Sequence, residues 1–249
     1  MQDAVHRAIE TIWSHYTEPV SLSDLADAAI LSRFYFSRVF REVTGTSPGR
    51  FLSAIRLHQA KEMLRDSELG VTDISYRVGY NSPGSFTSRF TRSVGLAPTR
   101  YRARARLLES GPLPEAPTPD PRCGTVVGTV HRSGVVPLRN VYVGAFGSPI
   151  AEGRPVSWDV LGPGRPRFRL HGLPEGTWYI RVAGLDGSVP DYGAERRMLI
   201  GTCPSITVRS GRVVELDVTL RHSSIYDLPV LFALPEFDCR DLALVAGVR

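Results

Sequence analysis

The sequence is poor in cysteine and contains no apolar stretch as long as a membrane-spanning helix. None of its apolar runs approaches the roughly 18 residues that a span requires, and the amino-terminal segment lacks the apolar core of a secretion signal. Its three cysteines, Cys123, Cys203 and Cys239, lie far apart and form no Cys-x-x-Cys pair. This spacing argues against a zinc finger and suits reduced thiols. We therefore expect a cytoplasmic protein that has no membrane partner and uses no cofactor.

The sequence also lacks the motifs on which common enzyme active sites are built. It has no His-Glu-x-x-His, no Gly-x-Ser-x-Gly, no phosphate-binding glycine loop and no complete Gly-x-Gly-x-x-Gly. His6 and His15 have no companion at metal-ligand spacing, so we expect both at the surface. These absences favour a binding protein over an enzyme.

Lysine is almost missing, since Lys61 is the only one among 30 basic residues. The formal net charge is +5, of which +4 lies before Gly111. Between Arg77 and Arg106 there are seven arginines and no acidic residue. Such a segment suits contacts with phosphate groups, which supply affinity and register. A general preference for arginine is the alternative explanation.

One segment occurs twice. The first copy, LADAAILSRFYFSRVFREVTGTSPGRF, runs from Leu25 to Phe51, and the second, ISYRVGYNSPGSFTSRFTRSVGLAPTRY, from Ile74 to Tyr101. Five residues recur 50 positions later, namely Ser32, Phe36, Phe40, Gly45 and Pro48 as Ser82, Phe86, Phe90, Gly95 and Pro98. Upstream the offset is 49, which indicates a one-residue insertion at Asn81. Such a repeat marks a duplicated supersecondary unit.

Each copy is predicted to hold two helices across a short turn, which is a helix-turn-helix. Ser21 and Ser32 are the expected caps in copy one, and Thr72 and Ser82 in copy two. The recurring glycine should end each second helix. Between the copies, a helix from Pro48 towards Gly70 would span roughly 30 Å, close to the ~34 Å turn of duplex DNA. It can place both copies on one face of DNA, and it can equally be an ordinary packed helix.

The second helix of copy one has two distinct faces. Phe36, Val39, Phe40 and Val43 fall on one arc, which we expect in the core. Arginine can reach guanine edges with two hydrogen bonds, and an apolar side chain can contact thymine methyl groups. A purely structural repeat would more often carry mixed Glu and Lys on its outer face. We predict that the outward positions of both copies read bases: Phe34, Ser37, Arg38, Arg41, Gly84, Thr87 and Ser88.

Phosphate contacts are predicted for two helix caps and for arginines of the basic segment. These residues are Ser32, Ser82, Arg89, Arg92, Arg100 and Arg102.

The paired segments, with their endings TGTSPGRF and VGLAPTRYR, resemble the DNA-binding domain of AraC-type transcription regulators over about residues 1–107. The resemblance implies that the second helix of each unit enters the major groove. It also implies that two positions on each helix contact bases, which are Phe34 and Arg38, then Gly84 and Ser88. The implied function is sequence-specific regulation of transcription, with double-stranded DNA as partner and RNA polymerase as a further candidate. Because the second pair is small, we expect copy one to set most of the sequence preference.

The helical pattern stops at a proline-rich stretch. Five prolines between Gly111 and Pro121 cannot continue a helix, so residues 110–121 are expected to be an extended linker. We predict a DNA-binding domain over residues 1–109, able to fold and bind DNA as a fragment of residues 1–110. A second domain is predicted over residues 122–249.

The second domain is predicted to be all β. About seven short strands, such as TWYIRVAG and VVELDVTL, alternate apolar and polar residues and favour an antiparallel β-sandwich. The segments GTVHRSGVVPLRNVYVGAF, FRLHGLPEGTWYIRVAG and ITVRSGRVVELDVTL resemble the carboxypeptidase regulatory-like domain, a prealbumin-like sandwich, over about residues 123–220. That resemblance implies a sensor or interaction module without catalytic residues, here expected to modulate DNA binding or assembly.

Two loops of this domain are candidates for binding an unknown small ligand or protein. Residues 147–164 include Trp158, and residues 184–197 include Asp191 and Tyr192. Long loops on rigid scaffolds often carry function, with ordinary loop variation as the alternative. The apolar tail IYDLPVLFALPEF, from Ile225, is either another strand or an interface segment.

Two other functions compete with transcription regulation. A methyl-accepting DNA repair protein also pairs a cysteine with an AraC-like domain, but the resemblance requires Pro-Cys-His-Arg, whereas the contexts here are PRCGT, GTCPS and FDCRD. We reject that reading. The alternative that stays open is an interaction protein whose sandwich docks a partner while the helices localise it to DNA.

Overall fold

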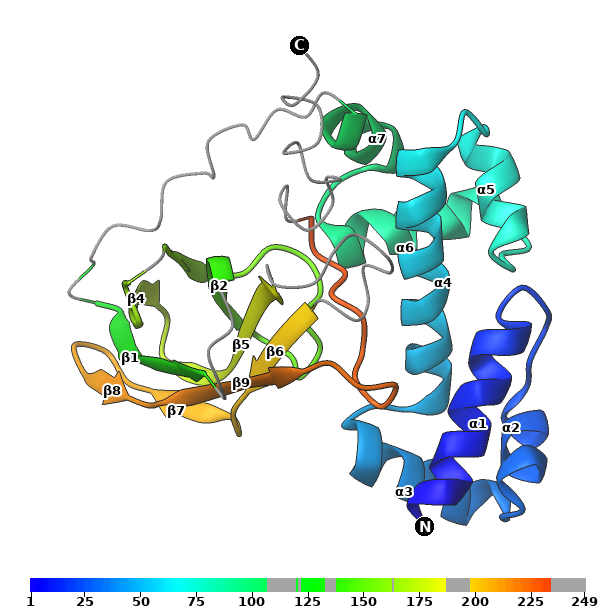
Figure 1. Ribbon diagram of the computed structural model, residues 1–249, viewed down its shortest axis with the longest axis horizontal. Coiled ribbons are helices and arrows are strands. Elements are labelled where there is room, and N and C mark those ends of the chain that lie inside the picture. The colour runs from blue at the N-terminus through cyan, green and yellow to red at the C-terminus, as the bar shows by residue number, and fades with distance from the viewer. Residues whose placement is uncertain (107–119, 121, 133–137, 163, 187–197, 234–249) are drawn as a thin grey trace. The chain divides into compact units, whose positions relative to one another are not determined.

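The computed structural model describes residues 1–106, 120, 122–132, 138–162, 164–186 and 198–233. The chain divides into two compact units (Figure 1). The helical unit comprises Met1–Gly111 together with Ile225–Arg249, and the β-unit comprises Pro112–Ser224. Most of the predicted linker, residues 110–121, lies outside the described residues.

The helical unit contains the predicted duplication. Its helices are α1 (Gln2–His15), α2 (Leu22–Ala29), α3 (Arg33–Thr44), α4 (Pro48–Asp66), α5 (Val71–Arg77), α6 (Pro83–Val94) and α7 (Pro98–Arg106). The pairs α2–α3 and α5–α6 are the two helix-turn-helix units. Helices α3 and α6 have 12 residues each and start 50 positions apart, which confirms the repeat.

Local sequence explains most helix ends. Ser21 caps α2 by accepting a hydrogen bond from the Asp24 amide, while the Asp24 carboxylate accepts one from the Ser21 amide. Gly45 and Gly95 adopt left-handed φ angles of 73° and 85° and end α3 and α6, as predicted. The predicted cap Thr72 is wrong, because the N-cap of α5 is Gly70, two residues earlier.

Each copy has its own core, and both cores have the same aromatic pattern. In copy one, the rings of Phe36, Phe40 and Phe51 meet edge to face, with successive centroids 5.4 and 5.5 Å apart. In copy two, the successive separations are 5.5 and 5.7 Å for the residues 50 positions on, Phe86, Phe90 and Tyr101. The repeat therefore extends into a third helix per copy, α7 matching the start of α4.

Helix α4 joins the two cores. Phe51 and Ile55 are fully buried in the first core, and Leu57 and Leu64 are fully buried in the second. It is therefore a packed helix that also connects the two copies. It ends at Asp66 and not near Gly70.

Residues Ile225–Ala233, which we call the return segment, pack on the helical unit. Leu228 contacts both cores, and Leu231 is 2% exposed in the second. The amide of Ala233 donates to the Val94 carbonyl at 3.0 Å. Figure 1 shows the segment running beside α4. This stretch, which was predicted to belong to a domain of residues 122–249, groups by its contacts with the helical unit, and its described residues form no strand.

The only lysine of the chain, Lys61 on α4, holds the return segment. It is 5% exposed, and its Nζ donates to the carbonyls of Val230 and Phe232 at 3.3 and 3.5 Å. The same nitrogen lies 5.5 Å from the centre of the Tyr101 ring. Because a buried cation needs such partners, the segment and α4 stabilise each other's polar groups.

The β-unit consists of nine described strands. They are β1 (Gly124–Arg132), β2 (Leu138–Phe146), β3 (Ser157–Leu161), β4 (Arg167–Leu173), β5 (Gly176–Asp186), β6 (Met198–Thr202), β7 (Ile206–Val208), β8 (Val213–Glu215) and β9 (Val218–His222). They pair in the order β3-β2-β5-β6-β9-β1-β4, with β7 on β5 and β8 on β1. The end strands β3 and β4 contact each other, so the sheet is nearly barrel-shaped.

The sheet is mixed, which corrects the expectation of purely antiparallel strands. Strand β1 pairs in parallel with β8 and β9, and all other pairs are antiparallel among the described strands. Parallel pairing needs a long crossover, which β2–β7 provide. Gly128 in β1 permits the close approach of the segment between β8 and β9, because a Cβ at Gly128 would lie 1.7 Å from the Leu216 carbonyl oxygen. Alternation along a strand shows which face is buried but not the direction of its neighbour.

Candidate nucleic-acid interface

Helix α3 exposes the face predicted to read bases. Phe36 and Phe40 are fully buried, whereas Phe34 is 84% exposed. Arg38 and Arg41 are exposed as well, and Ser37 is partly exposed. The predicted phase of this helix is confirmed, so an aromatic ring and two guanidinium groups face outward together.

Arg38 is partly oriented by its neighbour. Its guanidinium carbon lies 5.1 Å from the centre of the Tyr35 ring, within cation–π range. Stacking of this kind reduces the number of conformations available to the side chain, and it leaves the hydrogen-bonding edge of the guanidinium free to reach another molecule.

Helix α6 presents a shallower outward face. Gly84 and Ser88 are exposed, and Thr87 is partly exposed. The hydroxyl of Thr91 donates to the Thr87 carbonyl at 2.7 Å and is thus engaged within the helix. Only short side chains are available here for contacts with bases.

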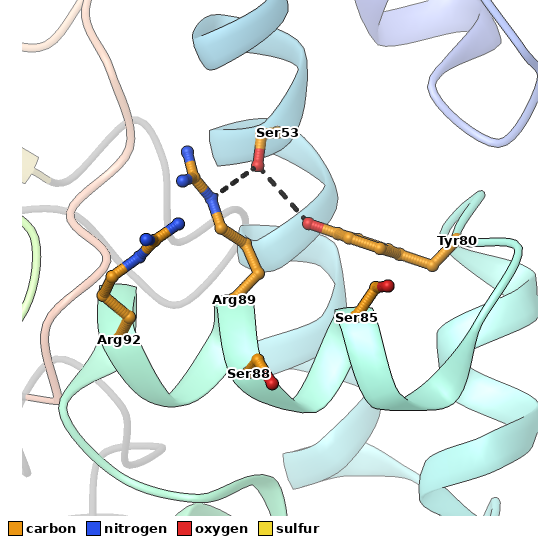
Figure 2. Close-up of a pocket in the computed structure, with 6 residues that line it drawn as sticks. All are labelled: Ser53, Tyr80, Ser85, Ser88, Arg89 and Arg92. Atoms are coloured by element: carbon orange, nitrogen blue, oxygen red, sulfur yellow. Dashed lines mark hydrogen bonds between the residues drawn. The ribbon is translucent and has the colours of Figure 1, made fainter.

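A pocket opens on the flank of α6, which we call the α6 pocket (Figure 2). It has a volume of about 390 Å³ and is lined by Ser53, Tyr80, Ser85, Ser88, Arg89 and Arg92. Arg89 Nε donates to Ser53 Oγ at 3.3 Å, and Ser53 Oγ lies 3.3 Å from the Tyr80 hydroxyl. Sequence reasoning missed Ser53 and Tyr80, because neither lies on a recognition helix and no motif marks them.

The two copies are fixed against each other beside this pocket. Arg56 on α4 donates to the Tyr16 and Glu18 carbonyls, both at 2.7 Å, and its burial lowers the pKa of its guanidinium. Gly79 precedes α6 with φ 84°, and a Cβ there would lie 2.7 Å from the Tyr16 carbonyl oxygen. The turn of copy two therefore packs against the loop after α1, which limits rotation between the copies.

The residues predicted to contact phosphate have different environments. Arg92 and Arg100 are exposed, and Arg89 is half-buried in the α6 pocket. Ser82 caps α6 by accepting from the Ser85 amide. Ser32 occupies the equivalent position at α3 without such a bond.

Arg102, also predicted to contact phosphate, has partners within the helical unit. Its guanidinium donates to the Leu64 carbonyl at 3.3 Å and also to the Leu69 carbonyl. It therefore fastens α7 to the end of α4. A basic run in a sequence does not reveal which of its members are used within the fold.

Of the residues predicted to bind a ligand in the β-unit, Trp158 is the one that the structure describes. Trp158 was expected in a loop but lies within β3, where it pairs with Gly144 of β2. Asp191 and Tyr192 lie outside the described residues.

In the parts of the chain that the structure describes, His, Cys, Asp and Glu form no group of three that could hold a metal ion. Over the same residues, none of the helices has the length and apolar composition needed to cross a membrane.

Known proteins share the helical part of this architecture. Residues 25–104 match a family model described as a helix-turn-helix domain. The chain is 40% identical over 88 residues to the RCS-specific HTH-type transcriptional activator RclR of Escherichia coli K12, covering 35% of this chain and 31% of that protein. It spans less than half the length of the curated relatives it matches, from 30% to 42% in three of them.

Two solved structures each match somewhat less than half of this chain. The DNA-binding domain of AdpA, solved in complex with a target DNA, is 31% identical with a TM-score of 0.41, covering 43% of this chain and 96% of that one. An AraC-type regulator from Chromobacterium violaceum is 25% identical with a TM-score of 0.40, covering 41% and 92%. The family match and the duplicated helix pairs identify residues 25–104 as a helix-turn-helix domain.

Proposed function

We propose that this protein is a sequence-specific DNA-binding regulator of transcription. The observation that carries the proposal is the pair of equal helices α3 and α6, each with its inner face in a core and its outer face exposed. Helix α4, with 19 residues, is about 28 Å long, near the ~34 Å turn of duplex DNA. The two outer faces can therefore enter successive major grooves. The description of RclR as a transcriptional activator supports this reading.

In this proposal, Phe34, Ser37, Arg38 and Arg41 read bases in one groove. Gly84, Thr87 and Ser88 lie in the next groove and contribute little direct readout, because their side chains are short. Arg92 and Arg100 contact phosphates, which fix position without specifying sequence.

The β-unit modulates binding or assembly in the same proposal. The return segment supports this role, because it follows directly on β9 and packs on both cores of the helical unit. The resemblance to the carboxypeptidase regulatory-like domain would make the β-unit an interaction module.

The full-length chain should select a consensus sequence from random DNA fragments. We expect one strongly preferred half-site and a weaker one about one helical turn away. Arg38→Ala should relax the consensus in the strong half-site, while Arg212→Ala, an exposed change on the β-unit that removes the same charge, should not. DNA binding without any consensus would instead favour the interaction protein that merely localises to DNA.

A further inference from the structure

We propose that the α6 pocket is a binding site for one phosphate group, occupied by a backbone phosphate of DNA in the bound state. The proposal rests on the proposed function for the identity of the ligand, but not for its chemistry. The chemistry follows from the six side chains that line the pocket.

Every polar group lining the pocket can donate a hydrogen bond. Two are guanidinium groups, from Arg89 and Arg92, the others are hydroxyls, and none of the described residues that line the pocket is acidic. Guanidinium groups bind phosphate oxygens with short, charge-assisted bonds, often two at a time. The two positive charges disfavour a cation in the same place. The lining therefore selects an anion with several acceptor oxygens.

The pocket is largely formed before any ligand arrives. The Tyr80 ring packs edge to face on Phe86, with centroids 5.4 Å apart, and the guanidinium carbon of Arg56 lies 5.9 Å from the centre of the Tyr80 ring. Ser53 Oγ connects Arg89 to the Tyr80 hydroxyl, so the three side chains are already aligned. Little conformational entropy remains to be lost at these positions when an anion binds.

The place of the pocket points to DNA as the source of the phosphate. Ser85 and Ser88 are exposed residues of α6, and Ser88 is also one of the predicted base-contact positions. Figure 2 shows Arg89 and Arg92 extending from α6 on the same side, towards α4. With α6 in a major groove, the strand that borders the groove passes the pocket. Copy two would then hold the register of the complex while copy one reads the sequence.

The first test is a double-mutant cycle between protein and DNA. In a selected site, each phosphate near the second half-site is replaced in turn by a neutral methylphosphonate. We expect one replacement to weaken wild-type binding about tenfold, the size of one charge-assisted hydrogen bond. Arg89→Gln should bind the unmodified site about tenfold more weakly and lose clearly less than tenfold further at that phosphate, because Arg92 is then the remaining charged partner. Arg212→Gln removes a matching charge from the β-unit and should keep the full methylphosphonate effect.

Tyr80→Phe is the second variant, because it removes one hydroxyl and keeps the ring that packs on Phe86. The methylphosphonate at the same phosphate should weaken binding of Tyr80→Phe by less than it weakens binding of the wild type. The reduction should be smaller than that seen with Arg89→Gln, and the melting temperature should be unchanged. This variant keeps the test decisive if Arg89→Gln fails to fold.

The second test uses inorganic phosphate and pyrophosphate on the full chain without DNA. If either anion raises the melting temperature of the wild type but not of Arg89→Gln, the pocket binds phosphate whatever the outcome with DNA. Coupling to a DNA phosphate identifies the backbone as the source. Anion stabilisation without such coupling identifies a small phosphorylated ligand. Absence of both effects overturns the proposal, whereas failure to select any DNA sequence overturns the proposed function alone.

Discussion

Arg38 and Arg92 are both exposed arginines, yet their positions lead to different expectations. Arg38 stands at the centre of the outer face of α3, so Arg38→Ala should weaken binding to the selected site by about 1–3 kcal/mol and relax its specificity. Arg92→Ala should weaken all sequences alike and lower the slope of affinity against salt by about 0.9. Binding titrations on specific and random DNA at several salt concentrations measure both effects. An unchanged ratio of specific to random binding for Arg38→Ala would contradict its role.

Asp24 provides a dependence of stability on pH. Hydrogen bonds from the backbone and the side chain of Ser21 lower the pKa of the Asp24 carboxyl below its ordinary value of 3.8. A lowered pKa in the folded state means that the ionised form stabilises the fold at higher pH, and that this contribution is lost as pH falls through the folded pKa. Urea unfolding should show a larger difference between wild type and Asp24→Ala at about pH 7 than at about pH 2.5. Equal differences at both pH values would mean that the carboxylate charge contributes nothing.

At the scale of elements, the return segment should stabilise the helical unit. Leu231 is 2% exposed, so Leu231→Ala should lower the free energy of unfolding by about 2–4 kcal/mol through the cavity it leaves. Ile225→Ala, in the same segment but 40% exposed, is the matched control and should have a much smaller effect. Thermal unfolding monitored by helical circular dichroism reports both. Similar small effects for the two variants would show that the segment rests on the surface without supporting it.

The elements differ in how far the sequence could predict them. Residue spacing was sufficient for α3 and α6, since a 3.6-residue period places Phe36 and Phe40 inward and Phe34 outward whatever the rest of the chain does. The same kind of pattern could not reveal that Leu231 packs beside α4. A short apolar segment has no periodicity, so its sequence does not show which element it packs against.

Polar contacts were the least predictable part of the site. Arg102 and Arg92 belong to the same basic run, yet one is bonded to backbone carbonyls and the other is exposed. Likewise, Ser53 and Tyr80 join the α6 pocket only because α4 and the turn before α6 meet in space. Such contacts depend on the tertiary structure, and the local sequence does not predict them.

At the scale of the whole molecule, the two recognition helices should contribute unequally. A scan of every base pair in the selected site should give penalties of about 1–3 kcal/mol per change in the half-site facing α3 and smaller ones in the half-site facing α6. The physical reason is the short reach of Gly84, Thr87 and Ser88. Equal penalties in both half-sites would contradict this, as would a stronger effect of Ser88→Ala than of Arg38→Ala.

The fragment Met1–Gly111 tests how complete the helical unit is without the rest of the chain. The sequence predicts that such a fragment folds and binds DNA alone, but it lacks the return segment that contacts both cores. We expect the fragment to melt at a lower temperature than the same fragment mixed with a synthetic peptide of residues Ile225–Ala233. A scrambled peptide of the same composition is the control. No shift with either peptide would show that the two copies hold together without it.

The discontinuity of the helical unit also sets an order in time. During synthesis the amino-terminal part of a chain emerges first, so α1–α7 leave the ribosome before the strands, and the return segment follows β9. A nascent chain halted anywhere in the β-unit already possesses α3 and α6 but lacks the residues that bridge their two cores. The helical unit is therefore the first to be synthesised but the last to be completed. It can be complete only after the β-unit has been translated.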